Sequence, residues 1–375
     1  MSEKLRIGVI FGGRSGEHEV SLVSATSIMQ ALDPAKYEVV PIGITREGRW
    51  LSSPQAIHLL KERLGLNGAA EQYLLPEPGR QGLISPGEQN SVIQRLDVVF
   101  PIVHGTFGED GTLQGLLELA DIPYVGAGVL GSAVGMDKII QKQLFADAGL
   151  PVVKYVWFLS DQCRREPGRV ASKVARDLRF PVFVKPANTG SSVGITKAHN
   201  KREILQGLAL AAEYDRKVII EQGANNVREI ECSVLGNSSP EASLPGEVIP
   251  SNEFYDYDAK YVDGKSRAEI PAKLPKTTSR LIQSLAIRAF KVLDLAGMAR
   301  VDFFVARKSH KVYLNEVNTL PGFTAISMYP KLWEASGVSF RELLDRLIGL
   351  ALERHAGKST LRTVFDPKAA WYKEG

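Results

Sequence analysis

Four polar side chains in the last third of the sequence have the types and spacing of a site for a cation and a phosphate. Arg300 and Asp302 are two residues apart, as are Glu316 and Asn318. Residues two apart on a β-strand share a face, so each pair would project to one side of its strand. Carboxylate and amide oxygens, with no histidine or cysteine nearby, favour Mg²⁺ or Mn²⁺ over zinc. A guanidinium beside such a site indicates chemistry on phosphate groups.

A β-hairpin would position these four residues. Residues 298–306 and 311–318 are rich in β-branched and aromatic side chains, and the charged segment 307–310 separates them as a turn. Pairing the two strands brings Asp302 to within about one residue of Glu316. The alternative is a solvated hairpin with alternating polar residues. A glycine-containing loop follows the hairpin at once, which favours the cation site.

A second candidate phosphate site is the small-residue loop 187–194, which follows a predicted strand at 178–185. Its glycines let backbone N–H groups approach phosphate oxygens, Ser191 and Ser192 add hydroxyl donors, and Lys185 adds positive charge. The loop lacks the G-x-x-x-x-G-K-[ST] pattern of a Walker loop. We therefore interpret it as a flap over a triphosphate, with a plain hairpin turn as the alternative.

The N-terminal segment predicts a strand, a glycine loop and a helix. Residues 6–11 form a short apolar run that ends at two glycines, and residues 20–32 have helical apolar spacing. The loop between them carries Glu17 at the carboxyl end of the strand, where ligands bind in open α/β sheets. A carboxylate there can pair with a substrate ammonium group. On the residues alone, a favourable interaction with the helix dipole is the preferred explanation.

Further buried strands at 97–103 and 123–126 extend this parallel α/β domain to about residue 140. His104 ends the first of these strands, and a loop role and a site role have equal weight. Lys138 lies in a helix predicted to begin near Ser132, where the alternative is an exposed helical lysine.

A strand at 217–222 contains Glu221 and precedes an alternating strand at 228–235. An acidic acceptor after an apolar strand can hold an adenine amino group and a ribose. The segment 251–267 is rich in Tyr, Asp and Lys without periodicity, which indicates a lid loop.

The whole-chain properties exclude several classes. The chain has 375 residues, a net charge of +4 and 44% hydrophobic residues, which fits a soluble globular protein of two or three domains. The charge excess is too small to indicate nucleic acid, and no segment approaches the length of a membrane span. Its two cysteines give no disulfide framework, so we expect reduced thiols and a cytoplasmic location. The G-x-G-x-x-G at 126–131 lacks the acidic partner of a dinucleotide fold.

Taken together, the motifs resemble the D-alanine:D-alanine ligases of the ATP-grasp superfamily. They occur in family order from residue 7 to about residue 335 and read HGTFGEDGTLQG, GMDK, FVKPANTGSSVGI, FYDYDAKY, MARVDFF and NEVNTLPGFTAISMYP. The resemblance implies an ATP-grasp fold, α/β and α+β, in three domains. These would be an N-terminal parallel α/β domain at 1–140, a central small α+β subdomain at 141–227 and a C-terminal α+β subdomain at 228–360 with the lid 251–267, followed by a tail at 361–375.

The resemblance also implies an activity and its residues. ATP would convert the carboxylate of one D-alanine to an acyl phosphate, which the amine of a second D-alanine attacks. The implied catalytic residues are Glu17, Ser191, Arg300 and Tyr261. The implied ATP-binding residues are Lys138, Lys185, Ser192, Glu221, Glu229 and Lys260. The implied amino-acid-binding residues are Glu17, His104, Gly322, Ser327 and Met328. Two Mg²⁺ (or Mn²⁺) ions would be held by Asp302, Glu316 and Asn318.

The sequence departs from the family pattern at two places, one near the implied adenine-binding site and one at an insertion. Gln222 stands where many relatives have a lysine, and the excursion at 52–94 is longer than in shorter members. Tyr261 favours an amide product, since relatives that make a D-lactate ester replace it. The family often dimerises through the N-terminal domain, so a homodimer is expected. The alternatives are another ATP-grasp carboxylate–amine ligase, a D-alanine:D-lactate ligase and a nucleotide-binding regulatory protein.

Overall fold

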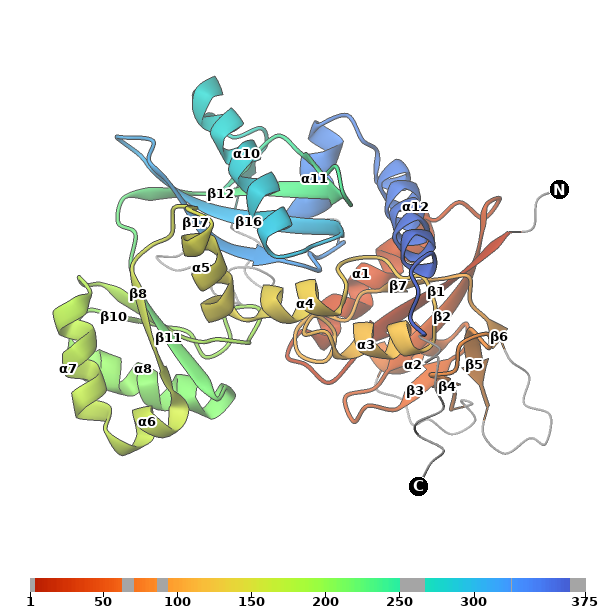
Figure 1. The fold of residues 1–375 in the computed structure, drawn as a ribbon, viewed down its shortest axis with the longest axis horizontal. Coiled ribbons are helices and arrows are strands. Elements are labelled where there is room, and N and C mark those ends of the chain that lie inside the picture. The colour runs from red at the N-terminus through yellow and green to blue at the C-terminus, as the bar shows by residue number, and fades with distance from the viewer. Residues whose placement is uncertain (1–3, 63–70, 86–93, 250–266, 325, 365–375) are drawn as a thin grey trace, which may run out of the picture.

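Three main β-sheets follow one another along the chain, and a small fourth sheet accompanies the first (Figure 1). The computed structural model describes residues 4–62, 71–85, 94–249, 267–324 and 326–364. Most of the predicted lid, including Lys260 and Tyr261, lies outside the described residues, as does the tail from residue 365. Among the described residues, no helix is long and apolar enough to cross a bilayer.

The N-terminal sheet has a parallel centre, as the short apolar runs predicted. Its order is β3 (Trp50–Ser52), β2 (Tyr37–Ile44), β1 (Leu5–Gly12) and β7 (Val98–Pro101), with only β3 antiparallel. The excursion supplies α2 (Ala56–Lys61) and the small sheet of β4 (Tyr73–Leu74), β5 (Gly82–Ile84) and β6 (Gln94–Arg95). Helix α1 (His18–Ala31) packs on β1. The loop that carries Glu17 therefore lies at the carboxyl edge of this sheet.

Two sequence predictions in the next segment are wrong. Residues 123–126 form no strand, because only Tyr124 bridges to Val99 before the chain turns at Gly126 with a φ of 99°. Lys138 is not inside the preceding helix. Asp137 is extended and its carboxylate accepts from the N–H groups of Ile139 and Ile140, so one helix ends and another begins there. The helices of this segment are α3 (Thr112–Leu119), α4 (Val129–Met136) and α5 (Lys138–Asp147).

The central sheet is antiparallel and carries its helices on one side. Its order is β10 (Thr196–Ala198), β9 (Val182–Pro186), β11 (Lys217–Gln222) and β8 (Tyr155–Leu159). Apolar side chains of the sheet pack against α7 (Pro167–Asp177) and α8 (Lys201–Tyr214), and α6 (Ser160–Arg165) lies beside α8. The predicted strand at 178–185 begins four residues later than expected. The small-residue loop connects β9 to β10 and extends from this sheet.

The C-terminal sheet contains the predicted hairpin. Its order is β15 (Arg267–Glu269), β14 (Gly246–Ile249), β12 (Val227–Gly236), β16 (Gly297–Ala306) and β17 (Val312–Asn318), and β13 (Glu241–Ala242) also pairs with β12. Alternate residues such as Ile230, Cys232 and Val301 are fully buried in a core shared with α10 (Lys276–Val292). This arrangement leaves the polar residues between them on the opposite face.

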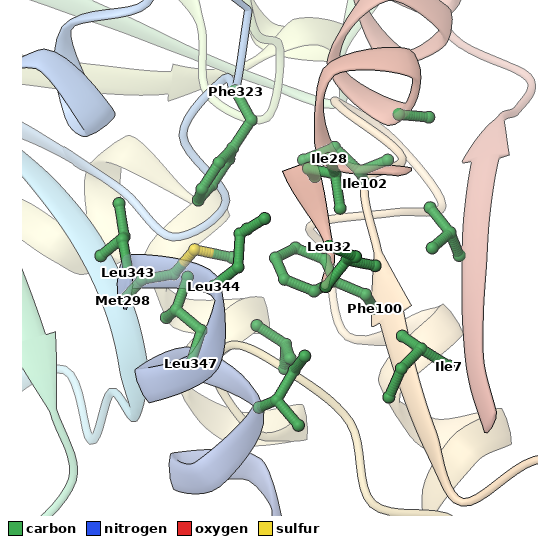
Figure 2. Close-up of a cluster of buried hydrophobic side chains, with 14 of the residues drawn as sticks. Ile7, Ile28, Leu32, Phe100, Ile102, Met298, Phe323, Leu343, Leu344 and Leu347 are labelled. Carbon is green, nitrogen blue, oxygen red and sulfur yellow. The ribbon is translucent and has the colours of Figure 1, made fainter. Parts of the chain in front are cut away.

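The last helix packs against the N-terminal sheet rather than only against its own neighbours (Figure 1). Helices α11 (Met328–Ala335) and α12 (Phe340–Ser359) follow the hairpin. Figure 2 shows Leu343, Leu344 and Leu347 of α12 in one cluster with Ile7 and Phe100. Burying each such side chain contributes about 1.5–3 kcal/mol. The two ends of the chain therefore share one core.

Candidate active site

One cavity of about 580 Å³ lies where the three main sheets face one another. It is lined by every predicted site residue that the structure describes: Glu17, His104, Lys138, Lys185, Ser191, Ser192, Glu221, Glu229, Arg300, Asp302, Glu316, Asn318, Gly322, Ser327 and Met328. The remaining two predicted residues lie outside the described part of the chain.

The hairpin register aligns the acidic residues and the arginine in two adjacent rows. Asp302 is directly opposite Glu316, and Arg300 is directly opposite Asn318. The Arg300 guanidinium donates to both oxygens of Asp302, with Nε–Oδ1 at 2.8 Å and Nη2–Oδ2 at 2.7 Å. The Asn318 amide donates to the same Oδ2 at 3.1 Å. Burial would lower the pKa of Arg300, but the negative charges of Asp302 and Glu231 raise this pKa well above the usual value.

These donors fit a hard divalent cation. Asp302 and Glu316 offer carboxylate oxygens side by side, and the Asn318 side chain can add an amide oxygen. The described residues contain no group of three or more His, Cys, Asp or Glu side chains arranged to hold a metal. Asp302, Glu316 and Asn318 supply two carboxylates and one amide. So few protein ligands fit a Mg²⁺ ion whose other ligands are phosphate oxygens, rather than an ion held by protein side chains alone.

A buried acid held by two lysines forms the side of the cavity next to the central sheet. Glu221 accepts from Lys185 at 2.7 Å through one carboxylate oxygen and from Lys142 at 2.9 Å through the other. Burial alone would raise the pKa of Glu221, but the two lysine charges bring it down to about 2. Burial lowers the pKa of Lys142, whereas the carboxylates near Lys185 outweigh burial and raise its pKa. The group carries one net positive charge.

Lys138 is not an exposed helical lysine. As the first residue of α5, it donates to the backbone carbonyl of Thr189 at 2.7 Å, and its Nζ lies 4.0 Å from Glu316 Oε2. Its side chain is only 11% exposed. A positive charge is thereby placed between the β9–β10 loop and the acidic hairpin.

The β9–β10 loop meets the N-terminal loop through two residues. The Ser191 hydroxyl donates to Glu17 Oε1. Ser191 and Ser192 both have positive φ, at 45° and 61°, a conformation that is uncommon for non-glycine residues. At Gly190, an added Cβ would lie 2.2 Å from Glu17 Oε2. The loop backbone thus approaches the carboxylate as closely as glycine allows.

His104 is buried beside a second acid. Its Nδ1 donates to the carbonyl of Leu320 at 3.1 Å and lies 3.5 Å from Glu109 Oε1. Burial would lower the pKa of His104, but Glu109 and Glu17 raise it. Burial also raises the pKa of Glu109, aided by the charge of Glu17. These contacts connect the N-terminal loops to the segment after the hairpin.

The segment after the hairpin closes on itself next to the cavity. The hydroxyl of Ser327 accepts from the Thr324 N–H at 2.9 Å and lies 2.8 Å from the Thr324 hydroxyl. At Gly322, an added Cβ would lie 2.9 Å from Ser327 Oγ. Met328 begins α11 and is buried. The cavity wall here consists of a tight turn and a helix start.

Glu109, Lys142 and Glu231 are among the charged residues in or beside this cavity that were not predicted from the sequence. Glu109 lies in the HGTFGED motif, so its position next to a histidine was the available signal. Glu231 lies two residues from Glu229 and therefore on the same face of its strand. Lys142 follows Lys138 by one helical turn, which was the only hint that it points the same way.

The two halves of the chain match two family models. The model described as D-ala D-ala ligase N-terminus matches residues 6–127, and the one described as D-ala D-ala ligase C-terminus matches residues 144–349. The chain belongs to the D-alanine–D-alanine ligase family. This membership confirms the resemblance seen in the motifs.

Relatives across the ligase family match over nearly their whole length. A D-alanine–D-alanine ligase of Thermoanaerobacter is 52% identical over 364 residues, covering 95% of this chain and 99% of that one. One of Natranaerobius thermophilus is 48% identical over 366 residues, covering 97% and 99%. Both are curated relatives with the same name.

Solved structures of the ligase family have the same fold. The D-alanine–D-alanine ligase from Coxiella burnetii superposes with a TM-score of 0.82 at 40% identity, covering 96% of this chain and 97% of that one. The VanG D-Ala:D-Ser ligase from Enterococcus faecalis also gives 0.82, at 37% identity and with 93% and 100% covered. The chain has the ATP-grasp fold, as predicted.

Proposed function

We propose that this chain is an ATP-dependent ligase that joins two D-alanines into D-alanyl-D-alanine, with release of ADP and phosphate, for peptidoglycan precursor synthesis. The observation that supports this most is the single cavity that collects the predicted cation, phosphate and ammonium-binding groups. The similarity to D-alanine–D-alanine ligases over nearly the whole chain supports the choice of substrate.

The reaction must first activate a carboxylate. A carboxylate oxygen of the first D-alanine attacks the γ-phosphorus of ATP, ADP leaves, and a D-alanyl phosphate forms. The amine of the second D-alanine then attacks the carbonyl carbon of the D-alanyl phosphate and loses a proton. Phosphate leaves and carries one oxygen from the carboxylate of the first D-alanine. Both steps bring negative charges together, so the protein must neutralise them.

The nucleotide side of the proposal assigns lysines to phosphates and acids to adenosine. Lys138 and Lys185, with Lys260 from the lid, neutralise the triphosphate, and Ser192 donates to it. Glu221 and Glu229 accept from adenosine. Asp302, Glu316 and Asn318 hold two Mg²⁺ (or Mn²⁺) ions, whose charge screens the phosphate oxygens. The buried Lys185–Glu221 pair keeps these groups charged and fixed before the nucleotide binds.

The amino-acid side of the proposal starts from Glu17, which pairs with the ammonium group of the first D-alanine. Ser191 and Tyr261 orient this carboxylate, and the Ser191 hydrogen bond to Glu17 supports that role. His104 lines the same region. Arg300 stabilises the transferred phosphate and the oxyanion of the tetrahedral intermediate. The second amino acid contacts Gly322, Ser327 and Met328.

The same proposal includes the lid at 251–267, which would exclude water from an acyl phosphate that hydrolyses readily. It also includes a homodimer, a cytoplasmic location and the domain limits at residues 140, 227 and 360. The homodimer is proposed because members of the family often dimerise through the N-terminal domain.

A second candidate is a ligase that accepts D-serine as the second amino acid, since the D-Ala:D-Ser ligase superposes as well as the D-alanine–D-alanine ligase. The test is phosphate release from MgATP with D-alanine alone, L-alanine alone, and D-alanine mixed with D-serine or D-lactate, followed by mass analysis. Release with D-alanine alone, and a D-alanyl-D-alanine product in every mixture, is expected. A D-alanyl-D-serine product in excess would favour the second candidate. No release with D-alanine would contradict the proposal.

A further inference from the structure

A third carboxylate occupies the same row of the sheet as the two predicted cation ligands. Strand β12 lies next to β16, and β16 lies next to β17. Their registers place Glu231 directly opposite Asp302, and Asp302 directly opposite Glu316. Directly opposed residues project from the same face of a sheet. Glu231 is 7% exposed and lines the cavity.

Glu231 reaches the same nitrogen of Arg300 that Asp302 does. Its Oε2 lies 3.1 Å from Arg300 Nε, while Asp302 Oδ1 lies 2.8 Å from that atom. The guanidinium is therefore flanked by two carboxylates, Asp302 from its own strand β16 and Glu231 from the neighbouring strand β12. Because Arg300 is itself largely buried, its orientation depends on these two partners.

The two partners of Arg300 differ in what else they must do. Asp302 gives both of its oxygens to the guanidinium in this structure, yet it is also a ligand for the proposed cation. A cation at Asp302 withdraws charge from the Arg300 pair and repels the guanidinium. An arginine that moved by even 1 Å would no longer meet the developing oxyanion.

We propose that Glu231 is a positioning residue that holds Arg300 in place while Asp302 turns to the cation. This inference rests on the proposed function of the site. Glu231 acts through Arg300 and touches neither the cation nor the amino acids. Because Glu231 holds Arg300, the Asp302 carboxylate is available to the cation.

The test uses Glu231→Gln, which keeps the shape of the side chain and removes its charge. We expect kcat to fall by about 10- to 100-fold, with the KM values for ATP and D-alanine changed by less than about threefold. Mn²⁺ binding to the ADP complex, followed by electron paramagnetic resonance, should weaken by about 3- to 10-fold because Arg300 then stays on Asp302. A kcat within about twofold of wild type would overturn the proposal.

A double variant shows whether the effect passes through Arg300. When Arg300→Met is already present, adding Glu231→Gln should change kcat and Mn²⁺ affinity by less than about threefold, because coupled residues give non-additive losses. A loss of Mn²⁺ affinity as large in that background as in the wild type would make Glu231 a cation ligand and contradict a positioning role.

Two further variants control for folding. Glu118→Gln removes a partly buried carboxylate that pairs with Lys358 and Tyr124 and is not among the residues that line the cavity, so it should affect stability but leave kcat within about twofold. Glu231→Asp keeps the charge and should recover part of kcat; if it is no better than Glu231→Gln, the charge is not what matters. The Mn²⁺ measurement uses no amino acid, so it tests Glu231 even if the enzyme fails to use D-alanine.

Discussion

The Glu17 carboxylate accepts a hydrogen bond from the Ser191 hydroxyl, which joins the N-terminal loop to the β9–β10 loop across 174 positions of sequence. Glu17 is supplied by the edge of the N-terminal sheet, and Ser191 by a loop of the central sheet. Neither sheet alone builds the proposed pocket for an ammonium group. The contact places a residue from the start of the chain beside the loop that we propose lies over the nucleotide phosphates.

The first prediction concerns the charge of Glu17. Glu17→Gln should lower kcat/KM for D-alanine by about 10- to 100-fold, because the acceptor facing the substrate ammonium group loses its negative charge. ADP affinity, measured by calorimetry, should stay within about twofold. Glu19→Gln is the matched control, since this nearby acid is half exposed and pairs with Arg46. Equal losses in both variants would argue against a specific role for Glu17.

The second prediction uses the close approach of the β9–β10 loop. Gly190→Ala places a Cβ 2.2 Å from Glu17 Oε2, so the loop or the carboxylate must shift. We expect kcat/KM for D-alanine to fall by about tenfold or more. Gly168→Ala is the control, because no atom lies within 4 Å of a Cβ there. Steady-state kinetics of both variants test this prediction. A fully active Gly190→Ala variant would show that the close approach of the β9–β10 loop to Glu17 is not needed for activity.

The third prediction concerns the buried Lys142. Lys142→Met leaves Glu221 with one cation instead of two, which should lower the free energy of unfolding by about 3–5 kcal/mol. Lys173→Met removes an exposed pair with Asp177 and should change the free energy of unfolding by less than about 0.5 kcal/mol. Urea unfolding at pH 7 measures both changes. Comparable values for the two lysines would contradict the contrast between buried and exposed pairs.

The same pair predicts a pH dependence. The pKa of Glu221 is about 2 in the folded state, below its ordinary value of 4.5, so its ionised form stabilises the fold above pH 4.5. This contribution decreases as the pH falls from 4.5 towards 2. In Lys142→Met the pKa of Glu221 rises towards its ordinary value, so the loss should be smaller and should end at a higher pH. Urea unfolding at a series of acidic pH values should show the shift, and identical acid profiles would contradict it.

The fourth prediction tests the contact of α12 with the N-terminal domain. Arg354 donates to the carbonyl oxygens of Gly126 and Tyr124 and stacks 4.1 Å from the centre of the Tyr124 ring. Arg354→Met should lower the free energy of unfolding by about 2–3 kcal/mol with little change in KM. Arg346→Met, which loses exposed pairs with Glu342 and Glu241, is the control. A midpoint shift no larger than that of the control would argue against α12 as a stabilising link.

The fifth prediction concerns the cation. Chelation by EDTA should abolish turnover, and Mg²⁺ or Mn²⁺ should restore it, because the donors are hard oxygens. Asp302→Asn should raise the Mg²⁺ concentration for half-maximal activity by about tenfold or more. Asp294→Asn, an exposed acid just before β16, should leave that concentration unchanged. Full activity in EDTA would contradict the assignment of a divalent cation.

The hairpin could be predicted because its signal is local. Alternation predicted which side chains share a face, and the turn limited their pairing to within about one residue. A register shift between Asp302 and Phe303 then places Asp302 opposite Glu316. The strand Lys217–Gln222 was predicted with the observed limits for the same reason. Short apolar runs followed by glycine carry enough information by themselves.

The rest depended on contacts between distant segments. Glu231 reads as one polar position in an alternating strand, and only the pairing of β12 with β16 places it beside Arg300. The apolar stripe of α12 does not say which sheet it covers, and the structure shows that it is the N-terminal one. Residues 123–126 have the composition of a strand, but the turn at Gly126 leaves a single bridge.

The most direct test of the central claim follows the carboxylate oxygen. D-alanine labelled with ¹⁸O in both carboxyl oxygens is incubated with MgATP, and the dipeptide and the phosphate are analysed by mass spectrometry. Activation as D-alanyl phosphate predicts D-alanyl-D-alanine together with phosphate that carries one ¹⁸O atom per molecule. Dipeptide formed alongside unlabelled phosphate, or no dipeptide at all, would contradict the proposed reaction.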